Sequence, residues 1–383
     1  PYILCPRSAQ AQLSQKLLLL LFQLHSNPCF HPDSSIGELP YAYHFDSALY
    51  GQFLRRYSER LGVKRIEGLI DDVTLDGQTG HVTAVQLAGG DAVAGDFFID
   101  CSGARGLLIK QALEADFEDW GHWLPCDRAL AVPSERFENT ALFTRSIAHD
   151  AGWQWRIPLQ HRNGNGLVYS SAHLDDNAAA DRLMGNLDTR AQADPKLIRF
   201  QTGRTRQQWH RNVTAIGLSS GFLEPLESTS IYLIQSAIVR LIHLFPHQGV
   251  TKQLVDEYNR QAKIEWETIR DFIILHYHLN ERDDGDFWKD VRHMSIPDRI
   301  RQKIDMFRSN GTLQQDQFDI FLDPSWLQVM LGQGVTPRDY HPLADNVTDS
   351  QLREKLINTH KTKQQPLERL PTHDEFLRAA CEA

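Results

Sequence analysis

The length and charge of this chain exclude several classes of protein. Its 383 residues suffice for one large domain or two ordinary domains, each with a buried core. Acidic residues outnumber basic ones by 49 to 40, and no basic stripe is visible, which argues against a nucleic acid as partner. The five cysteines are odd in number and scattered, so they indicate neither a disulfide framework nor a zinc knuckle.

The most apolar run of the chain lies near its beginning, at residues 17–22. It is too short to span a bilayer, which takes about 20 apolar residues. No small-residue cleavage site follows it, so it is not typical of a signal peptide. We therefore predict a buried helix here, no membrane as partner, and a cytoplasmic location.

Alternating short elements follow. A helix-like stretch ends at Arg60, and strands are predicted up to Leu75 and over residues 82–87. Two pairs of residues typical of hairpin turns separate these runs: Asp76-Gly77 and Gly89-Gly90. An apolar strand then runs from Asp96 into a turn of small residues that ends at Gly106. Together these patterns predict an α/β sheet module.

Residues 126–175 continue the predicted sheet module with further strands and a turn at residues 163–166. Within them, residues 153–158 read Trp-Gln-Trp-Arg-Ile-Pro. Side chains two residues apart point to the same face of a strand, so Trp153 and Trp155 would form one bulky stacked wall.

The most informative segment is residues 212–238. A β-branched run breaks at Gly217, a loop with two glutamates follows, and an apolar pattern predicts a helix from about residue 231. Residues 228–230, Ser-Thr-Ser, stand where an N-cap belongs. A helix start presents unpaired N–H groups and the positive end of a dipole, so it favours an anion, here beside two carboxylates. Feature by feature, an ordinary βα turn rich in capping residues explains the same pattern.

The segment as a whole resembles the flavin-dependent halogenase family, typified by tryptophan halogenases. The block Pro225-Leu226-Glu227-Ser228-Thr229 matches the Pro-x-Glu-Ser-Thr block of that family. Residues 153–158 match its W-x-W-x-I-P signature, and residues 96–106 are similar to a strand and turn of FAD-dependent monooxygenase folds. The resemblance implies a flavin-binding α/β module, here residues 1–235, and a mostly helical substrate-side module, residues 236–383.

Two features of that family are not found in this chain. No G-x-G-x-x-G fingerprint opens on a strand and helix, and no lysine stands in the context of the family's catalytic lysine. The chain also begins with Pro1 rather than Met. We expect an N-terminal portion of roughly a hundred residues or more to be absent from the sequence as given; a degenerate member of the family is the other reading.

The resemblance also implies a reaction. FADH2 from a separate flavin reductase, O2 and chloride or bromide would give hypohalous acid, which halogenates tryptophan, free indole or a related electron-rich arene. Glu227 would stabilise the cationic arene or accept its proton, and Ser228 would couple the halide side to the substrate side. Backbone N–H groups of Thr229 and Ser230 would cradle the halide. Many relatives have glycine where this chain has Ser230, so serine would narrow the halide site.

Further contacts are implied position by position. Leu218, Ile231 and Ile70 match residues beside the flavin, the isoalloxazine ring and the adenine end respectively, and Gly221 belongs to the same cofactor loop. The tryptophans of the 153–158 block would form a wall that keeps the substrate away from the flavin.

The helical half offers two further candidates. Trp326 is a candidate surface for stacking an indole, although an aromatic residue here is more often part of a core. His276-Tyr277-His278 with Glu281 invites a metal reading, but residues two apart on a helix do not share a face, so we predict no metal.

Three interpretations remain open at this point. The first is the flavin-dependent halogenase, an oxidoreductase whose partners are a flavin reductase and a small aromatic molecule, and which allows a homodimer. The second is a flavin-dependent aromatic monooxygenase, which would want a Gly-Asp pair where this chain has Gly217-Leu218. The third is a non-catalytic flavin-binding relative.

Overall fold

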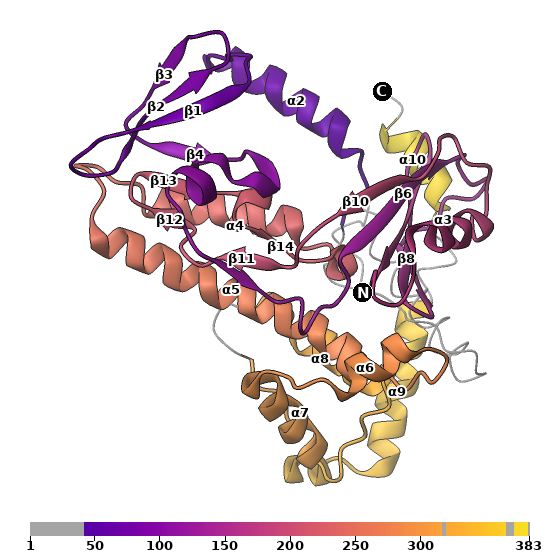
Figure 1. Ribbon diagram of the computed structural model, residues 1–383. Helices are drawn as coiled ribbons and strands as arrows, with labels where there is room; N and C mark the ends of the chain where they lie inside the picture. Colours follow the sequence, from indigo (N-terminus) through magenta and orange to yellow (C-terminus); the bar gives the residue numbers. More distant parts are fainter. Residues whose placement is uncertain (1–41, 316–318, 365–370, 382–383) are drawn as a thin grey trace. The chain divides into compact units, whose positions relative to one another are not determined.

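A computed structural model of the protein describes residues 42–315, 319–364 and 371–381 (Figure 1). The apolar run at residues 17–22 lies outside the described residues. The described residues divide into two compact units, unit 1 with residues 42–57, 129–198, 339–364 and 371–381, and unit 2 with residues 58–128, 199–315 and 319–338. The division into modules of residues 1–235 and 236–383 stays a prediction.

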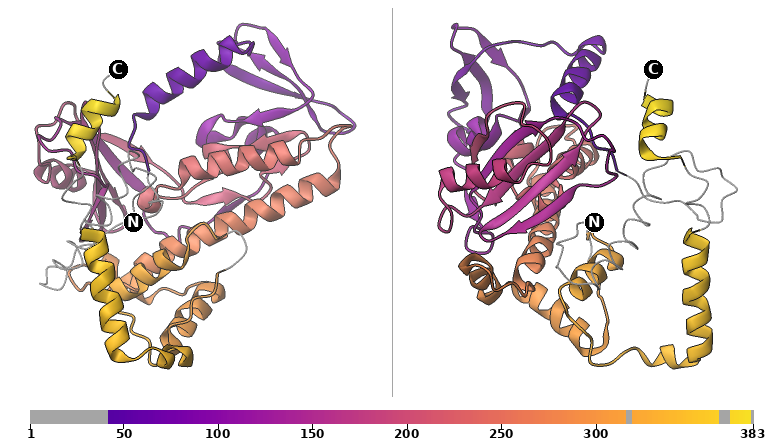
Figure 2. Two further views of the ribbon diagram at one scale, coloured as in Figure 1. Left: turned by 180° about the vertical axis from the view of Figure 1, so that it is seen from behind. Right: turned by 90° about the vertical axis from the view of Figure 1, so that its right-hand side faces the viewer.

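Unit 1 is built on a five-stranded sheet in the order β10-β6-β9-β8-β7. Its strands are β6 (Arg128–Ser134), β7 (Arg145–His149), β8 (Gly152–Pro158), β9 (Asn163–Tyr169) and β10 (Lys196–Arg199). Helix α3 (Asp176–Gly185) packs on this sheet (Figure 2). The packing is apolar, because Ala179 and Leu183 of α3 are fully buried against Leu130, Leu167 and Tyr169.

One predicted turn in this sheet is wrong. Residues 163–166, rich in asparagine and glycine, form the first half of strand β9, and the chain reverses before it, where the N–H of Leu159 donates to the carbonyl of Arg162. The asparagines serve the sheet interior: the Asn163 amide donates to the carbonyl of Glu135 at 2.6 Å, and the Asn165 amide to Ser134 Oγ at 3.0 Å. A side chain at Gly166 would overlap the Trp155 indole, so the glycine makes room for that ring.

The remaining elements of unit 1 are helical. Helix α2 (Ser47–Arg60), which continues past residue 57, begins at Asp46, whose carboxylate accepts hydrogen bonds from the N–H groups of Ala48 and Leu49. Arg162 donates to the same carboxylate at 2.7 Å, and this bond is the main cause that lowers the pKa of Asp46. Three further elements follow: η5 (Pro342–Asn346), α9 (Asp349–Gln364) and α10 (His373–Cys381).

Unit 2 contains three small sheets. Strands β1 (Ile70–Leu75), β2 (Val82–Leu87) and β3 (Ala92–Ala94) form an antiparallel sheet, which confirms both predicted hairpin turns. In the second sheet, β13 (Val213–Ala215) pairs parallel with β4 (Phe98–Asp100) and antiparallel with β12 (Trp209–His210). The third has the order β14 (Gly221–Phe222), β11 (Gly203–Thr205) and β5 (Phe117–Asp119).

The helices of unit 2 are organised around α5 (Lys252–His278), the longest helix of the described residues (Figure 1). The first half of α5 packs against β12 and α4 (Ser230–His243), with Tyr258 and Ala262 buried against Trp209 and Leu241. Its second half packs against α6 (Asp286–His293), α7 (Asp298–Asn310) and α8 (Asp323–Gly332). Helix α5 therefore connects the β-strands to the other helices within this unit.

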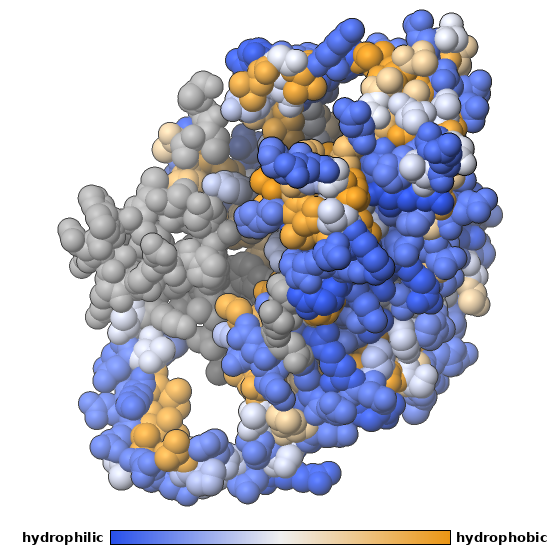
Figure 3. Space-filling view, turned by 90° about the vertical axis from the view of Figure 1, so that its left-hand side faces the viewer, coloured by the Kyte–Doolittle hydropathy of each residue, from blue (hydrophilic) through white to orange (hydrophobic). Residues whose placement is uncertain are grey.

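Exposed apolar side chains interrupt the hydrophilic face that Figure 3 draws. On the face drawn in Figure 3, blue residues predominate and hydrophobic residues form separate orange areas. Several large apolar side chains of α4 are exposed, among them Ile231, Ile238 and Ile242. No helix in the described part of the chain is both long enough and apolar enough to cross a bilayer.

Candidate active site

The candidate site begins where the parallel strands β4 and β13 end. Gly217 has a φ of +76°, and a 3-10 turn, η3 (Gly217–Ser219), follows it. The hydroxyl of Ser219 lies within hydrogen-bond distance of the carbonyls of Asp100 and Ile216, which ties the ends of the two strands together. The carboxyl ends of parallel strands are where α/β sheets place their ligands.

Asp100 organises the turn on the other side of this junction. Its buried carboxylate accepts hydrogen bonds from the N–H groups of Ser102, Leu108 and Ile109 at 2.9 to 3.0 Å. It thereby holds the first turn of a short π-helical segment, Leu107–Ala112. The predicted strand and small-residue turn at residues 96–106 are present, with Asp100 as their structural centre.

The segment from Glu224 to Ser230 has an irregular backbone. A 3-10 turn, η4 (Pro225–Glu227), ends at Ser228, which adopts the left-handed conformation with φ 53° and ψ 33°. That conformation costs a residue with a Cβ about 1 kcal/mol or more. The chain changes direction at Ser228, so the turn that carries Glu227 and the helix α4 that follows it run in different directions.

The first turn of α4 is not capped in the usual way. Thr229 occupies the N-cap position, as predicted for this serine-threonine block, and is buried. Within the described residues, its side chain makes no cap hydrogen bond. Ser230 and Ile231 at the helix start are exposed. The geometry therefore leaves the positive end of α4 accessible to an anion.

Glu227 lies beside this helix start, with a side chain only 9% exposed. Its Oε1 is 3.0 Å from Nε2 of His276, whose side chain is 5% exposed. The other ring nitrogen, Nδ1, is 2.8 Å from the carbonyl oxygen of Phe272, one turn earlier on α5. The acid predicted to be catalytic thus has little exposed side-chain surface and contacts a histidine from a distant part of the sequence.

Helix α5 also holds Glu224 through a hydrogen bond. The hydroxyl of Tyr277 donates to Glu224 Oε1 at 2.6 Å, and Cys126 Sγ lies 3.6 Å from that hydroxyl. Burial raises the pKa of both Tyr277 and Cys126 well above their usual values, so both stay protonated at neutral pH. His276 and Tyr277 therefore fix both glutamates that flank Pro225 and Leu226.

The predicted cofactor contacts fall into two kinds of environment. Leu218 and Ile231 are apolar yet 49% and 42% exposed, and their elements η3 and α4 contact each other. Ile70 is half-buried at the start of β1. Gly221 is buried, and a Cβ there would approach the backbone of Arg204 and the ring of Trp266. Close packing explains this glycine, and a cofactor contact for Gly221 stays a prediction.

Trp326 belongs to an aromatic cluster of unit 2. It is 3% exposed, its ring meets Phe272 edge-on at 4.9 Å, and its Nε1 donates to the carbonyl of Phe321. Phe272 in turn meets the His276 ring edge-on at 5.1 Å. The structure thus places Trp326 in the core, near the Glu227–His276 pair, and direct stacking with a substrate stays a prediction.

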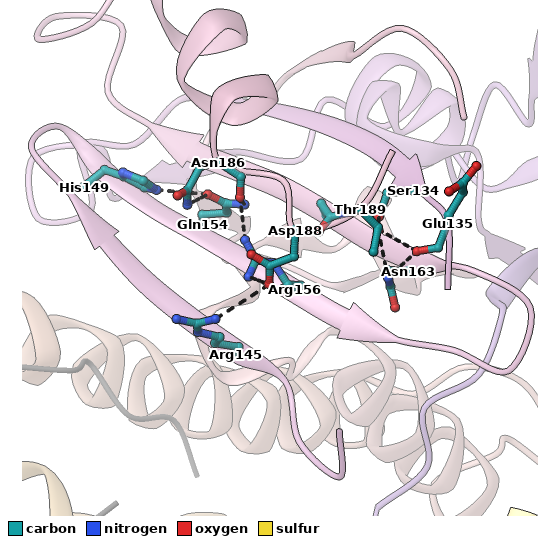
Figure 4. A network of polar contacts seen from close by, with 11 residues as sticks. Ser134, Glu135, Arg145, His149, Gln154, Arg156, Asn163, Asn186, Asp188 and Thr189 are labelled. Atoms are coloured by element: carbon teal, nitrogen blue, oxygen red, sulfur yellow. Dashed lines mark hydrogen bonds and ion pairs between the residues drawn. The ribbon is translucent and has the colours of Figure 1, made fainter. Parts of the chain in front are cut away.

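Trp153 and Trp155 lie in unit 1, on one face of β8. Their ring centroids are 6.1 Å apart, but the rings are inclined by 56°, so they are tilted rather than stacked as predicted. The side chains of Gln154 and Arg156, which alternate with the two tryptophans along β8, enter a polar network with the loop at residues 186–189 (Figure 4). Gln154 accepts from His149 and Asn186 at 3.0 and 2.7 Å, and Arg156 is paired with Asp188.

The histidines of α5 do not form a metal site with their neighbours. Among the residues that the structure describes, no group of three or more His, Cys, Asp or Glu side chains could hold a metal ion. His276 is committed to Glu227 and to the Phe272 carbonyl.

Comparison with known proteins identifies the family. A sequence model of the family described as "Tryptophan halogenase" matches residues 14–349. The tryptophan 7-halogenase RebH of Lentzea aerocolonigenes is 35% identical, over 88% of this chain and 68% of that protein. The chain belongs to the tryptophan halogenase family.

Solved structures agree with this assignment. A flavin-dependent halogenase from Xanthomonas campestris is 45% identical with a TM-score of 0.90, covering 97% of this chain and 73% of that one. BrvH, a flavin-dependent halogenase from Brevundimonas sp. BAL3, is 41% identical with a TM-score of 0.91, covering 99% and 82%. This halogenase is therefore a flavin-dependent enzyme of the oxidoreductase class, and the predicted mixed fold of sheets and helices is confirmed.

The residues around the halogenase's helix start fit a flavin. A flat isoalloxazine ring needs apolar surface on its face and hydrogen-bond donors near its polar edge. The exposed side chains of Leu218 and Ile231 offer the first, and the accessible start of α4 offers the second. Sequence reasoning missed His276 as the partner of Glu227, because a contact between distant parts of the chain leaves no periodic signal in the sequence. The only hint was the His276-Tyr277-His278 run itself.

Proposed function

We propose that this halogenase uses FADH2, O2 and chloride or bromide to halogenate an indole or a related electron-rich arene. The observation that carries the proposal is the largely shielded Glu227 carboxylate beside the accessible N-terminus of α4, which would bring an acid–base group and an anion site together. The relatives support the substrate class, since RebH is named a tryptophan 7-halogenase and ThaL of Streptomyces albogriseolus a tryptophan 6-halogenase.

Leu218, Ile231 and the start of α4 would hold the flavin, with Ile70 toward its adenine end. When bound, FADH2 would supply two of the four electrons that reduce O2, and the halide would supply the other two as it becomes hypohalous acid. The halide would lie against the N–H groups of Thr229 and Ser230, where the helix dipole favours an anion. Because Ser230 has a side chain at the mouth of this site, it would narrow the space for the halide.

Glu227 would act on the arene. Attack of the ring on the electrophilic halogen gives a cation, and a nearby carboxylate both stabilises the positive charge and accepts the ring proton. General base catalysis of this kind typically contributes about 10²–10⁴-fold. Ser228, in its left-handed conformation, would fix Glu227 relative to the halide-binding residues on the next piece of chain.

The partners follow from this chemistry. A separate flavin reductase would deliver FADH2 by diffusion or transient contact, and the second partner would be a small aromatic molecule. We also propose a cytoplasmic enzyme, in keeping with its need for reduced flavin, and a homodimer as its assembly. Trp153 and Trp155 would form the wall that separates the substrate from the flavin.

The test is mass spectrometry of the products made by the full-length protein with FAD, a flavin reductase, NADH, O2, halide and a panel of indoles that includes tryptophan. A halogenated indole is the expected result. Hydrogen peroxide with no halogenated product across the panel contradicts the proposal, and a hydroxylated product favours a monooxygenase instead. The ratio of brominated to chlorinated product, compared with that of Ser230→Gly, measures how far Ser230 sets halide preference.

A further inference from the structure

We propose that His276 positions Glu227 for proton transfer from the arene and shares a proton with it, an inference that rests on the proposed function of Glu227. The pair consists of two buried side chains whose nearest polar atoms, His276 Nε2 and Glu227 Oε1, are 3.0 Å apart. His276 touches neither halide nor arene in this proposal. It is a positioning residue that acts through Glu227.

The protonation of the imidazole follows from its two contacts. The Phe272 carbonyl oxygen can only accept, so Nδ1, which lies 2.8 Å from it, carries a hydrogen. Nε2 then faces a carboxyl oxygen, and two lone pairs at 3.0 Å would repel each other. A proton on either atom, giving an imidazolium beside a carboxylate or a carboxylic acid beside a neutral imidazole, would turn this close contact into an attraction.

The surroundings hold the ring in this orientation. Phe272 contributes both the carbonyl that accepts from Nδ1 and an aromatic ring that meets the imidazole edge-on. The side-chain amide of Gln333, in the Gly-Gln-Gly loop after α8, donates to the backbone carbonyl of His276 at 3.1 Å. On the other side of the pair, Tyr277 fixes Glu224, so the backbone before Glu227 cannot easily move away.

These contacts assign the two carboxyl oxygens different roles. Oε1 is engaged by His276, which leaves Oε2 to receive the proton that the arene loses. The ring C–H bond breaks, its electron pair returns to the ring, and an O–H bond forms at Oε2. After this step the arene proton is on Oε2 and the shared proton is on Nε2, whichever of the two residues carried the shared proton at the start. The pair has thus gained one proton and is an imidazolium beside a carboxylic acid.

Kinetics of three variants test this role. His276→Ala should lower kcat for halogenation by about 10²-fold, the cost of a misplaced catalytic group. The KM for the arene should stay within about twofold, since His276 does not touch it. His276→Gln retains an N–H donor that can reach Oε1 but cannot take up a proton, so it should recover part of the loss. His278→Gln, two residues further along the same helix, is the matched control and should keep the wild-type kcat.

A readout that needs no turnover keeps the two proposals separable. In protein labelled with ¹⁵N-histidine, the His276 ring should show a protonated Nδ1, and its Nε2 signal should shift in Glu227→Gln but not in Glu257→Gln, an exposed control. An unprotonated Nδ1, or an Nε2 signal that is the same in Glu227→Gln as in the wild type, overturns the inference.

The two kinds of failure are distinct. If the wild-type enzyme halogenates an arene and His276→Ala retains its kcat, the positioning role is wrong and the proposed function stands. If the wild type halogenates nothing, the proposed function fails, and the NMR result alone decides whether the pair shares a proton. Equal kcat losses in His276→Ala and His276→Gln with unchanged Nε2 signals contradict the inference as well.

Discussion

The segment from Glu224 to Ser230 and strand β8 carry the two most recognisable motifs of this sequence, yet they are held in opposite ways. Strand β8 is regular, pairs with β9 along its whole length and with β7 from Gly152 to Arg156, and has its polar side chains braced by the network in Figure 4. The Glu224–Ser230 segment forms a 3-10 turn and a left-handed residue, and it is fixed by side chains of α5. A wall of bulky rings, the role proposed for the β8 tryptophans, would need a stiff, repetitive backbone, whereas the role proposed for Glu227 needs one fixed orientation, which side chains of α5 supply.

The two ion pairs show the same contrast. Arg156 is 3% exposed but its partner Asp188 is 45% exposed, so water reaches one end of the pair. Both members of the Glu227–His276 pair are almost fully buried. The first arrangement suits a brace for the sheet, and the second keeps water away from the group that is proposed to take up a proton.

The largest expected effect is on catalysis. Glu227→Gln keeps the shape of the side chain but removes the base, so halogenation should slow by about 10²–10⁴-fold with little change in folding. The rate of product formation under saturating FADH2 and halide measures this. Glu257→Gln, on the exposed face of α5, is the control and should leave the rate unchanged. A Glu227→Gln enzyme with wild-type activity would contradict the role of this residue.

The next effect is on the brace of β8. Asp188→Ala leaves the buried Arg156 guanidinium without its carboxylate, so the free energy of unfolding should fall by about 2–3 kcal/mol. Asp150→Ala removes a pair with Arg182 in which both side chains are 34% to 42% exposed, and should cost about 1 kcal/mol or less. Urea unfolding of the two variants compares them. Equal losses would show that Asp188 is no more than a surface partner.

A smaller effect is expected from a single methyl group beside the tryptophan wall. Gly166→Ala places its Cβ against the Trp155 ring, so the free energy of unfolding should fall by about 1–3 kcal/mol and the tryptophan fluorescence should change. Gly164→Ala, on the same strand, meets only ordinary contacts at 3.5 Å or more and should leave the fluorescence as it is. If both variants behave alike, the indole is not packed on Gly166.

The smallest effect has the opposite sign. Ser228→Gly removes the Cβ from a left-handed residue, so the protein should become more stable by about 0.5 kcal/mol after the entropy cost of glycine is subtracted. Ser230→Gly, at a position with helical backbone, should instead lose about as much. Thermal unfolding distinguishes the two signs. A loss of stability in Ser228→Gly would mean that its hydroxyl contributes more than its backbone strain costs.

Local patterns in the sequence determined a large part of this protein. Hairpin turns at Asp76-Gly77 and Gly89-Gly90, the start of the helix after residues 228–230 and the strand before Gly217 were predicted from residues within a few positions of each other. The turn at residues 163–166 was predicted wrongly, because asparagine and glycine also serve where a strand must accept a distant indole and bond to a neighbouring strand. The motifs themselves, being contiguous, were enough to indicate the halogenase family.

Only the tertiary structure decided what those motifs touch. The chain order gives no sign that His276 lies on Glu227, that Tyr277 lies on Glu224, or that Trp326 is buried against Phe272. These contacts depend on the direction in which α5 crosses the loop before α4 and on which of its faces is buried there. Backbone propensity is a property of neighbours in sequence, whereas the placement of a buried acid depends on how distant elements pack, and packing is settled only when the whole core forms.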